Sequence, residues 1–458
     1  MQQVRLPIKA VLLLPLAALY LYGLSAMGIV TPDEPRYADI GRAMAQSGDW
    51  VMPRLFGTPW FEKPALLYWI TALGNLAGLG PELAPRLPVA LLSLVFLAFF
   101  WHRVRDEWGQ QTAIYSTAIL ATSAGWLAFS RTGVTDIPVA VCFNAALLFA
   151  LPWATRNDAG KSGLTPAAAC LALGFLAKGI VPLALFFPVL LFGYRRLGAW
   201  FRTLAIPVFL LLALPWYVLV SLQSNGEFLR VFFLEHTFGR VVSTNLQHVQ
   251  KWWFYLWVLP LLLFPWFPLL TGVKLRDNRT RLLGAVVVFG LFAFSVSINK
   301  LPGYVLPLVP SLAILAGESL ARQEQKYPLI ATAALAGLLP FAAGVIPAAL
   351  AGGLHSASFP WPRLLAVPFC ALAGWVAVRW RQGFSGVTAG LAAGLLALEI
   401  LTLPEISRVA SARGLWLEKR PNCLQKMNRS MAYGLQYYAG HSLPECPLLD
   451  PDNSRVVR

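Results

Sequence analysis

Charged side chains are scarce in this sequence of 458 residues. Asp, Glu, Lys and Arg make up 13% of the chain, and hydrophobic residues make up 57%. A soluble domain carries about 25% charged residues, so a water-facing surface of this size is excluded. Five cysteines are too few for a disulfide scaffold. The sequence also lacks a Walker A motif, a Rossmann glycine fingerprint and a nucleophile elbow, the usual marks of soluble enzymes.

Long apolar runs recur along the whole chain instead. Their length matches the roughly 17–25 residues that a helix needs to cross a hydrocarbon core, and the mean hydropathy of the chain is +0.61. They predict an all-α polytopic membrane protein. Thirteen spans are expected, near residues 8–30, 84–101, 110–130, 137–154, 164–178, 180–194, 203–222, 253–271, 282–298, 303–320, 328–351, 361–380 and 384–403. The first run lacks a small-residue cleavage site and is predicted to be retained as a helix.

The basic residues indicate how the chain is oriented. The formal charge is +16, but these residues lie in short loops between apolar runs, which is typical of cytoplasmic loops and not of a nucleic-acid surface. The loops on the other side hold the acidic residues Asp33, Glu34, Asp39, Asp49, Glu62, Asp136, Glu227 and Glu235. The run ALLYWITALGNLAGLG has about sixteen residues, and counting it as a span would invert every later loop. It is therefore predicted to be a surface or re-entrant helix, and DEPRYADIGRAMAQSGDW an amphipathic surface helix.

This orientation divides the chain into two parts. Residues 1–403 form the predicted transmembrane domain, with major external loops at 31–83 and 223–252, and residues 404–458 form a small external segment. External thiols commonly pair, so a disulfide between Cys423 and Cys446 is expected. The alternative is two free thiols in a cytoplasmic tail, which requires one span more or fewer.

Ionisable residues at the outer ends of apolar helices are the candidate functional residues, because such groups are costly near a membrane. A carboxylate such as Asp33 can act as a base towards a hydroxyl. Cations can offset the charge of a departing lipid phosphate. The set comprises Asp33 with Glu34, Glu62 with Lys63, Asp136 in RTGVTDIP, Glu235 and His236 with Arg240 in EHTFGR, Lys300 in NKLPGY, and Lys178 at an external turn.

Each of these residues has a simpler interpretation. Asp33 caps a surface helix, and His236 is a polar loop residue. Lys63, Arg240, Lys300 and Lys178 are then anchors in the headgroup region. Against this, Glu62 and His236 can share a divalent metal, since carboxylate and imidazole both suit zinc. Asp136, between two long apolar runs, needs a partner, and the basic cluster on the same face supplies one.

Six segments follow one another between about residues 28 and 320: TPDEPRYADIGRAMAQSGDWVMPRLFGTPWFEKPALLYW, APRLPVALLSL, RTGVTDIP, GFLAKGIVPLAL, EHTFGR and NKLPGYVLPLVP. Together they resemble the bacterial lipid A 4-amino-4-deoxy-L-arabinose transferases, which belong with the protein O-mannosyltransferase-like GT-C glycosyltransferases. The resemblance implies a GT-C bundle of about thirteen transmembrane helices with periplasmic juxtamembrane helices. It also implies an undecaprenyl-phosphate-linked sugar donor and an inverting transfer at the periplasmic face of the inner membrane.

The resemblance also implies roles for individual residues. Asp33 is then the acid beside the reacting sugar, and Lys63 binds the donor phosphate with help from Arg240. Glu62 and His236 become metal ligands, Asp136 holds the Lys63 region, and Tyr304 lines the lipid-phosphate cavity with Lys300 nearby. The external C-terminal portion, at about 55 residues, is shorter than in the arabinose transferases, which leaves the sugar and the acceptor open.

The function expected from the sequence is transfer of 4-amino-4-deoxy-L-arabinose, or a related sugar such as a uronic acid, to lipid A or the lipopolysaccharide core. One alternative is a protein O-glycosyltransferase with a serine or threonine acceptor. A second is a transporter or flippase of lipid-linked sugars. A transporter predicts ionisable residues near mid-span and a repeat between the halves, whereas the ionisable residues here cluster at one face.

Overall fold

The computed structural model describes residues 17–156, 160–238, 249–322, 325–352 and 383–447. Their regular elements are helices apart from two short strands, which form one hairpin. The elements of the first half are α2 (Asp33–Ser47), β1 (Arg54–Leu55), β2 (Thr58–Pro59), α3 (Leu66–Leu76), α4 (Leu83–Trp108), α5 (Gln110–Ala121), α6 (Ala124–Ser130), α7 (Asp136–Thr155), α8 (Leu164–Lys178), α9 (Val181–Leu185), α10 (Phe187–Phe192), η1 (Tyr194–Arg196), α11 (Gly198–Phe201) and α12 (Ala205–Gln223).

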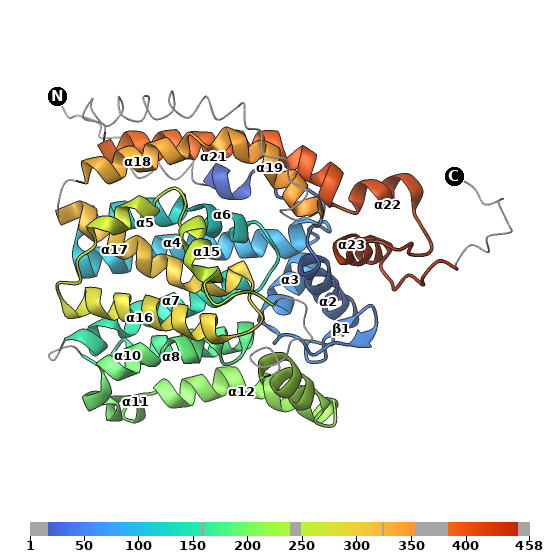
Figure 1. Ribbon diagram of the computed structural model, residues 1–458. Helices are drawn as coiled ribbons and strands as arrows, with labels where there is room; N and C mark the ends of the chain where they lie inside the picture. Colours follow the sequence, from blue (N-terminus) through green and yellow to red (C-terminus); the bar gives the residue numbers. More distant parts are fainter. Residues whose placement is uncertain (1–16, 157–159, 239–248, 323–324, 353–382, 448–458) are drawn as a thin grey trace, which may run out of the picture.

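The second half continues the helical block and adds a small C-terminal segment. Its elements are α13 (Glu227–Leu229), the π-helix η2 (Arg230–Phe238), α15 (Phe254–Leu262), η3 (Phe267–Gly272), α16 (Asn278–Val296), η4 (Pro302–Leu308), α17 (Val309–Arg322), α18 (Lys326–Ala336), α19 (Leu339–Gly352), α21 (Gly383–Ala410), α22 (Arg413–Lys419) and α23 (Arg429–Ala439). In Figure 1 the long helices lie side by side as a block, and α2, α3, α22 and α23 gather at its right-hand end.

Helix length and composition confirm a multi-pass membrane protein. The described residues hold six helices long and apolar enough to cross a membrane, or up to eight if two bent pairs count as spans. The predicted span 110–130 is the pair bent by 62°. The predicted span 180–194 corresponds to the first arm of the other pair, Val181–Phe192, which is followed by Tyr194–Phe201 at 90°. Hydropathy does not detect the first bend, because the apolar run continues through it, whereas the second bend lies where Arg195 and Arg196 end the apolar run. The span at 361–380 and the start of the first span lie outside the described residues, so the count of thirteen stays a prediction.

Two helices form the centre of the block. In α7 and in the η4–α17 unit, 89% of the most apolar window is buried, against 28% in α12 at the edge. Both central helices begin at the end of the block that carries α2. The first residue of α7 is Asp136, and Tyr304 lies in the first turn of η4. The two best-packed helices therefore present their first turns at the same end of the molecule.

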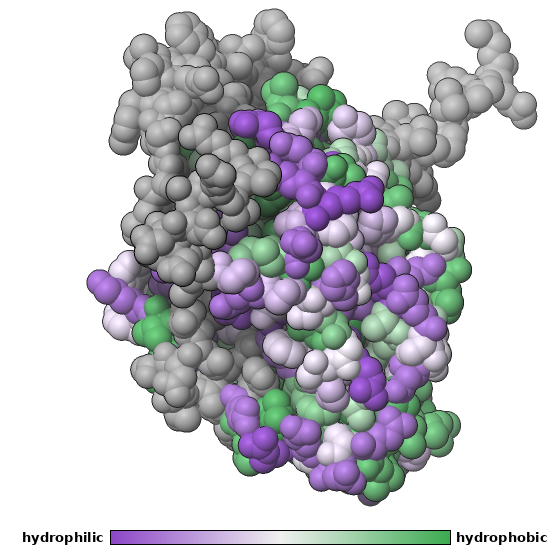
Figure 2. Space-filling view, turned by 90° about the vertical axis from the view of Figure 1, so that its right-hand side faces the viewer, coloured by the Kyte–Doolittle hydropathy of each residue, from purple (hydrophilic) through white to green (hydrophobic). Residues whose placement is uncertain are grey.

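The external loop before α4 folds onto this end. The helix α3, with 11 residues, is roughly 16 Å long and too short to cross a hydrocarbon core of about 30 Å, as expected of a surface or re-entrant helix. The helix α2 differs from the prediction of a surface helix, because most of its residues, charged ones included, are buried against α3, α4 and α23. Figure 2 shows many hydrophilic residues on the described surface of this end.

Candidate functional site

Arg36 in the first turn of α2 joins two carboxylates, Asp33 of the same turn and Glu62 of the loop before α3. Arg36 donates from Nη1 to Glu62 Oε2 at 2.6 Å and from Nη2 to Asp33 Oδ1. Lys63 Nζ lies 3.1 Å from Glu62 Oε1, so Glu62 contacts two cations. The side chains of Arg36 and Glu62 are 6% and 7% exposed, whereas that of Asp33 is 35% exposed. Asp33 is therefore the carboxylate of this cluster that a substrate can reach.

A buried ion pair fixes the residue next to Asp33. Arg86 of α4 donates from Nε and Nη2 to the two oxygens of Glu34, each at 2.7 Å, and both side chains are fully buried. Arg86 also donates to the Gly28 carbonyl at 3.0 Å, and Glu34 accepts the Gly133 N–H at 2.9 Å. Bidentate pairing gives geometric specificity as well as strength. The start of α2, the N-terminal half of α4 and the loop before α7 are thus locked together.

The loop before α7 leads to a second charged cluster. Asp136 accepts a 2.8 Å hydrogen bond from Lys178 Nζ at the end of α8. The same ammonium lies 4.8 Å from the centre of the Tyr304 ring. Gly303 fits against Asp136 so closely that a Cβ built on it would lie 2.4 Å from the carboxylate. Three segments that are far apart in sequence therefore meet around one ion pair.

Aromatic packing brings α13 and the π-helix η2, which follow each other in the chain, to the two clusters. Phe228 and Phe232 stack with a ring-centre distance of 5.3 Å, and Phe228 also packs on Phe61, next to Glu62. Phe232 lies against Gly179, where an added Cβ would meet its ring at 2.7 Å. Consequently α13 packs against the segment of Lys63, and η2, which carries His236, packs against the segment of Lys178. Arg240 lies outside the described residues, so its role at the donor phosphate stays a prediction.

Lys300 is placed in the loop before η4, but its ammonium is engaged by the backbone. It donates to the Gln250 carbonyl at 3.1 Å and to the Ser297 carbonyl. Its residue is 4% exposed, and burial lowers the pKa of the Lys300 ammonium. These contacts tie the loop before Tyr304 to residue 250. The role of Lys300 at a donor phosphate stays a prediction.

The surroundings of Glu62 bear on the predicted metal. Its two carboxylate oxygens face the guanidinium of Arg36 and the ammonium of Lys63. Two cations in these positions compete with a metal ion for the same oxygens, so the donor set as folded does not fit a Glu62 metal site. Among the described residues there is no cluster of three His, Cys, Asp or Glu side chains placed to hold a metal ion. Glu62 acts here as an anchor for two cations.

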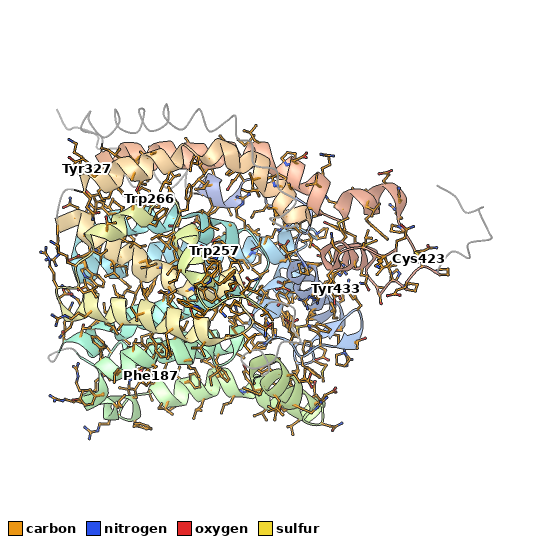
Figure 3. All side chains as sticks on the ribbon, in the orientation of Figure 1. Phe187, Trp257, Trp266, Tyr327, Cys423 and Tyr433 are labelled. Carbon is orange, nitrogen blue, oxygen red and sulfur yellow. A yellow bond between two sulfur atoms is a disulfide. The ribbon has the colours of Figure 1, made fainter. Side chains whose placement is uncertain are left out.

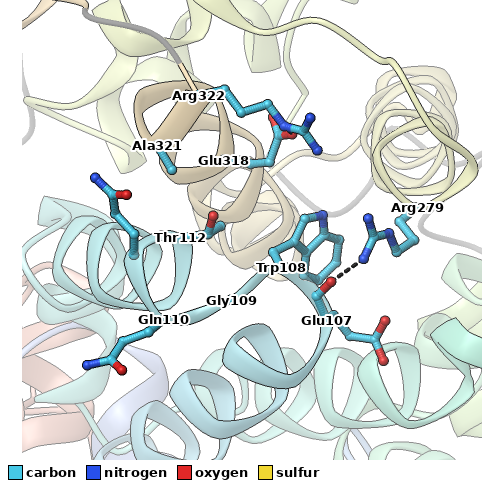
Figure 4. Close-up of a pocket in the computed structure, with 10 residues that line it drawn as sticks. Glu107, Trp108, Gly109, Gln110, Thr112, Arg279, Glu318, Ala321 and Arg322 are labelled. Carbon is cyan, nitrogen blue, oxygen red and sulfur yellow. Dashed lines mark hydrogen bonds and ion pairs between the residues drawn. The ribbon is translucent and has the colours of Figure 1, made fainter.

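A cavity of about 360 Å³ lies at the opposite end of the block. Figure 4 shows its lining where α4 ends and α5 begins, with Trp108 and Arg279 facing each other. Its charged residues are already paired, because Arg322 contacts Glu318 and Arg279 donates to the Glu107 carbonyl. The helix α4 has 26 residues, which places this cavity roughly 39 Å along the helix from the site. It belongs to the end formed by the basic loops.

Sequence analysis overlooked some residues that the structure makes central. Arg36 was not singled out, although it lies three residues after Asp33, a spacing that places both on one helix face. Arg86 is a charge inside the apolar run APRLPVALLSL, which by itself signals a buried partner. Lys178 was interpreted mainly as an anchor, whereas it pairs with Asp136. The structure leaves open the prediction that Asp136 holds the Lys63 region.

A further buried ion pair involves the last long helix of the block. Arg131 and Glu399 of α21 are 3.2 Å apart, with side chains 9% and 11% exposed. Arg131 also donates to the carbonyls of Leu19 and Tyr22. The pair therefore joins the C-terminal long helix to the N-terminal segment and to the loop before α7.

The chain is similar to known proteins in both sequence and structure. Residues 62–220 match the family described as dolichyl-phosphate-mannose-protein mannosyltransferase. The undecaprenyl phosphate-α-4-amino-4-deoxy-L-arabinose arabinosyl transferase 2 of Pseudomonas fluorescens strain Pf0-1 is 30% identical over 393 residues, which cover 80% of this chain and 69% of that protein. The corresponding transferase 1 of Sodalis glossinidius is 34% identical over 367 residues, covering 76% and 65%.

A solved structure matches almost the whole chain. The crystal structure of ArnT from Cupriavidus metallidurans bound to undecaprenyl phosphate has a TM-score of 0.76 and 26% sequence identity. The match covers 96% of this chain and 86% of that one. Two further curated Pseudomonas relatives are spanned over only 55% and 60% of their length.

Proposed function

Because this chain belongs to the undecaprenyl phosphate-α-4-amino-4-deoxy-L-arabinose arabinosyl transferase family, with the all-α GT-C fold, we propose that it is a membrane glycosyltransferase using an undecaprenyl-phosphate-linked sugar. The sugar is 4-amino-4-deoxy-L-arabinose or a related one, such as a uronic acid. The acceptor is lipid A or the lipopolysaccharide core. The chain lies in the bacterial inner membrane, with its site facing the periplasm.

The observation that carries the proposal is the setting of Asp33. Its carboxylate is partly exposed, while the arginine that orients it and the neighbouring Glu34 are buried and fixed. A reacting group held by rigid supports meets the geometric demand of catalysis, because little reorganisation is needed during the reaction. Two lysines, Lys63 and Lys178, come from the same end of the block. This arrangement suits an acid beside a sugar whose leaving group is a phosphate.

The reaction exchanges one glycosidic bond for another. The acceptor oxygen forms a bond to the anomeric carbon, and the bond from that carbon to the lipid phosphate oxygen breaks. The electron pair leaves on the phosphate, and attack from the opposite face inverts the configuration. If the acceptor is a hydroxyl, Asp33 takes its proton. If the acceptor is an anionic phosphate oxygen, Asp33 orients the reacting groups and stabilises positive charge developing on the sugar.

Cations offset the charge that the phosphate gains as it leaves. Two lysines have this role. Glu62 positions Lys63, and Asp136 and Tyr304 position Lys178. A lysine ammonium acts as a point charge towards phosphate. Arg240 on the chain that continues η2 is proposed as a further phosphate ligand, and Tyr304 as a lining residue of the lipid-phosphate cavity. No step of this mechanism requires the metal that Glu62 and His236 were predicted to share.

The test replaces Asp33 by asparagine in the purified, liposome-reconstituted chain. The donor is undecaprenyl-phosphate-linked 4-amino-4-deoxy-L-arabinose, the acceptor is lipid A, and mass spectrometry detects the added sugar. We expect Asp33→Asn to lower the transfer rate at least about 100-fold, the lower range for loss of a general acid–base group. Asparagine is nearly isosteric and still accepts from Arg36, so binding of undecaprenyl phosphate should change by less than about twofold.

The matched control is Asp49→Asn, whose carboxylate accepts the local Val51 and Met52 N–H groups. It should retain transfer. Full activity of Asp33→Asn would refute the catalytic role of that residue. Sugar found on serine or threonine of a peptide acceptor, and not on lipid A, would establish the protein O-glycosyltransferase instead. Donor movement across the liposome without a new glycosidic bond would establish the flippase.

A further inference from the structure

The C-terminal segment reaches the candidate site through one aromatic ring. Tyr433 in the second turn of α23 lies with its ring centre 5.3 Å from the guanidinium carbon of Arg36. In Figure 3 the label of Tyr433 marks the place where α23 meets α2, while Cys423 lies at the outer side of the same segment. A cation within about 6 Å of an aromatic ring centre is attracted by the ring face. The contact therefore joins residue 433 to the arginine that orients Asp33.

The helix α23 is docked independently of this contact. Tyr437 donates to the Pro81 carbonyl at 2.8 Å, and its ring lies 4.5 Å from the Arg42 guanidinium carbon. Tyr438 donates to Glu82 at 2.9 Å and accepts the Ile29 N–H at 2.9 Å. The disulfide between residues 423 and 446 closes the chain around α23. With this many anchors, Tyr433 is not needed to hold α23 in place.

Arg36 is enclosed by aromatic rings on several sides. Its guanidinium carbon is 5.8 Å from the ring centre of Tyr37 and 5.7 Å from that of Trp60, in addition to the Tyr433 contact. The residue is 5% exposed. Two of the rings, Tyr37 and Trp60, come from the external loop that contains Arg36 itself. The third comes from almost 400 residues further along the chain and covers the guanidinium from the C-terminal segment.

We propose that Tyr433 is a positioning residue for the transfer reaction, acting through Arg36 on Asp33. The inference rests on the proposed function. Tyr433 restricts the guanidinium to the orientation in which Nη1 meets Glu62 and Nη2 meets Asp33. Among the described residues, Arg36 forms the ion pair with the partly exposed Asp33 carboxylate. The C-terminal segment thereby forms one wall of the site and sets the direction of the reacting carboxylate.

The experiment compares Tyr433→Leu, which removes the ring, with Tyr433→Phe, which keeps it. We expect Tyr433→Leu to lower kcat roughly 3- to 30-fold, the span of a partly desolvated cation–π contact, with the donor KM within twofold. Tyr433→Phe should restore kcat to within threefold of wild type. In an Arg36→Lys background the same Tyr433→Leu change should add less than twofold, because residues that act through one another are not additive.

A matched control makes the same change at the other end of the molecule. Tyr327 is 82% exposed at the start of α18, and Figure 3 shows it far from Tyr433. Tyr327→Leu should leave kcat and donor KM at wild-type values. An unchanged kcat in Tyr433→Leu would overturn the proposal. So would a full, additive loss in the Arg36→Lys background, which would assign Tyr433 a role independent of Arg36.

A second readout does not depend on turnover. Hydrogen–deuterium exchange of the first turn of α2 should become faster in Tyr433→Leu and stay unchanged in Tyr433→Phe and Tyr327→Leu. If wild-type protein transfers no sugar from any undecaprenyl-phosphate-linked donor, the proposed function fails. Hydrogen–deuterium exchange then still tests whether Tyr433 restrains the first turn of α2 through Arg36. If transfer proceeds but neither kcat nor exchange responds to Tyr433→Leu, only the inference about Tyr433 fails.

Discussion

At the scale of single residues, the site depends on close approaches that only particular side chains permit. Thr31, two residues before Asp33, has φ of 64°. This left-handed conformation is a true outlier for a β-branched residue, and such strain tends to persist where surrounding contacts over-determine the backbone. Here the buried Arg86–Glu34 ion pair supplies such contacts. The chain therefore holds the start of α2 in an unfavourable conformation beside the carboxylate proposed to react.

Gly303 gives the sharpest prediction at this scale. An added Cβ would lie 2.4 Å from Asp136 Oδ1 and 3.0 Å from Phe129. Gly303→Ala should push the Asp136 carboxylate away from Lys178, destabilise the fold by about 1–3 kcal/mol through overpacking, and lower transfer more than tenfold. Thermal unfolding and the transfer assay check this. The control is Gly390→Ala on α21, where an added Cβ meets nothing within 4 Å.

That control should be neutral or slightly stabilising, because alanine is a better helix former than glycine by about 1 kcal/mol. A Gly303→Ala protein with wild-type stability and activity would show that the 302–304 turn moves freely relative to Asp136. The proposed arrangement of Asp136, Lys178 and Tyr304 around the lipid phosphate would then lose its structural basis.

At the scale of elements, sequence periodicity and length predicted most helices but not their interruptions. The predicted span 137–154 matches α7 almost residue for residue, because an apolar run bounded by Asp136 and Arg156 has unambiguous ends. The bend within 110–130 was missed, since hydropathy carries no information on helix direction. Site residues were found where a charge interrupts an apolar pattern, as at Asp136. Pairings such as Arg36 with Glu62 need the fold itself, because they join separate elements.

The C-terminal segment supplies the prediction for this scale. The predicted disulfide between Cys423 and Cys446 is confirmed, and the backbone of Leu424 pairs with Pro444 and Cys446 beside it. In the chain-entropy account, closing a loop of this length contributes about 3 kcal/mol to the free energy of unfolding of the segment. A double Cys423→Ser, Cys446→Ser variant should therefore show faster hydrogen exchange across α23, while the helical block keeps its unfolding temperature.

Thiol labelling gives the direct check. In unreduced protein a maleimide should leave both residues unmodified, and after mild reduction it should label both. Cys142, which is buried and free, serves as an internal control and should resist labelling in both conditions until the protein is denatured. Immediate labelling of Cys423 and Cys446 before reduction would contradict the pairing.

At the scale of the whole molecule, the two ends of the helical block differ in their charged groups. The basic loops predicted to be internal contact one another at the end away from α2. Arg156 pairs with Glu107, Arg196 donates to the Arg156 carbonyl, and Arg279 donates to the Glu107 carbonyl. The acidic segments predicted to be external meet at the end that holds Asp33 and Asp136. The number of predicted spans and the contacts between loops thus assign the loops to the same two ends of the block, although the two arguments rest on unrelated properties of the sequence.

This division predicts the sidedness of the protein in the membrane. Gln46 at the end of α2 and Gln110 at the start of α5 are both exposed and lie at opposite ends of the block. In a background without other cysteines, Gln46→Cys should react with a membrane-impermeant maleimide on intact spheroplasts. Gln110→Cys should react only after the membrane is opened, because basic loops stay on the cytoplasmic side. Labelling of Gln46→Cys only after the membrane is opened would place Asp33 on the cytoplasmic side, away from the periplasmic donor and acceptor, and the proposed transfer would have no site in which to occur.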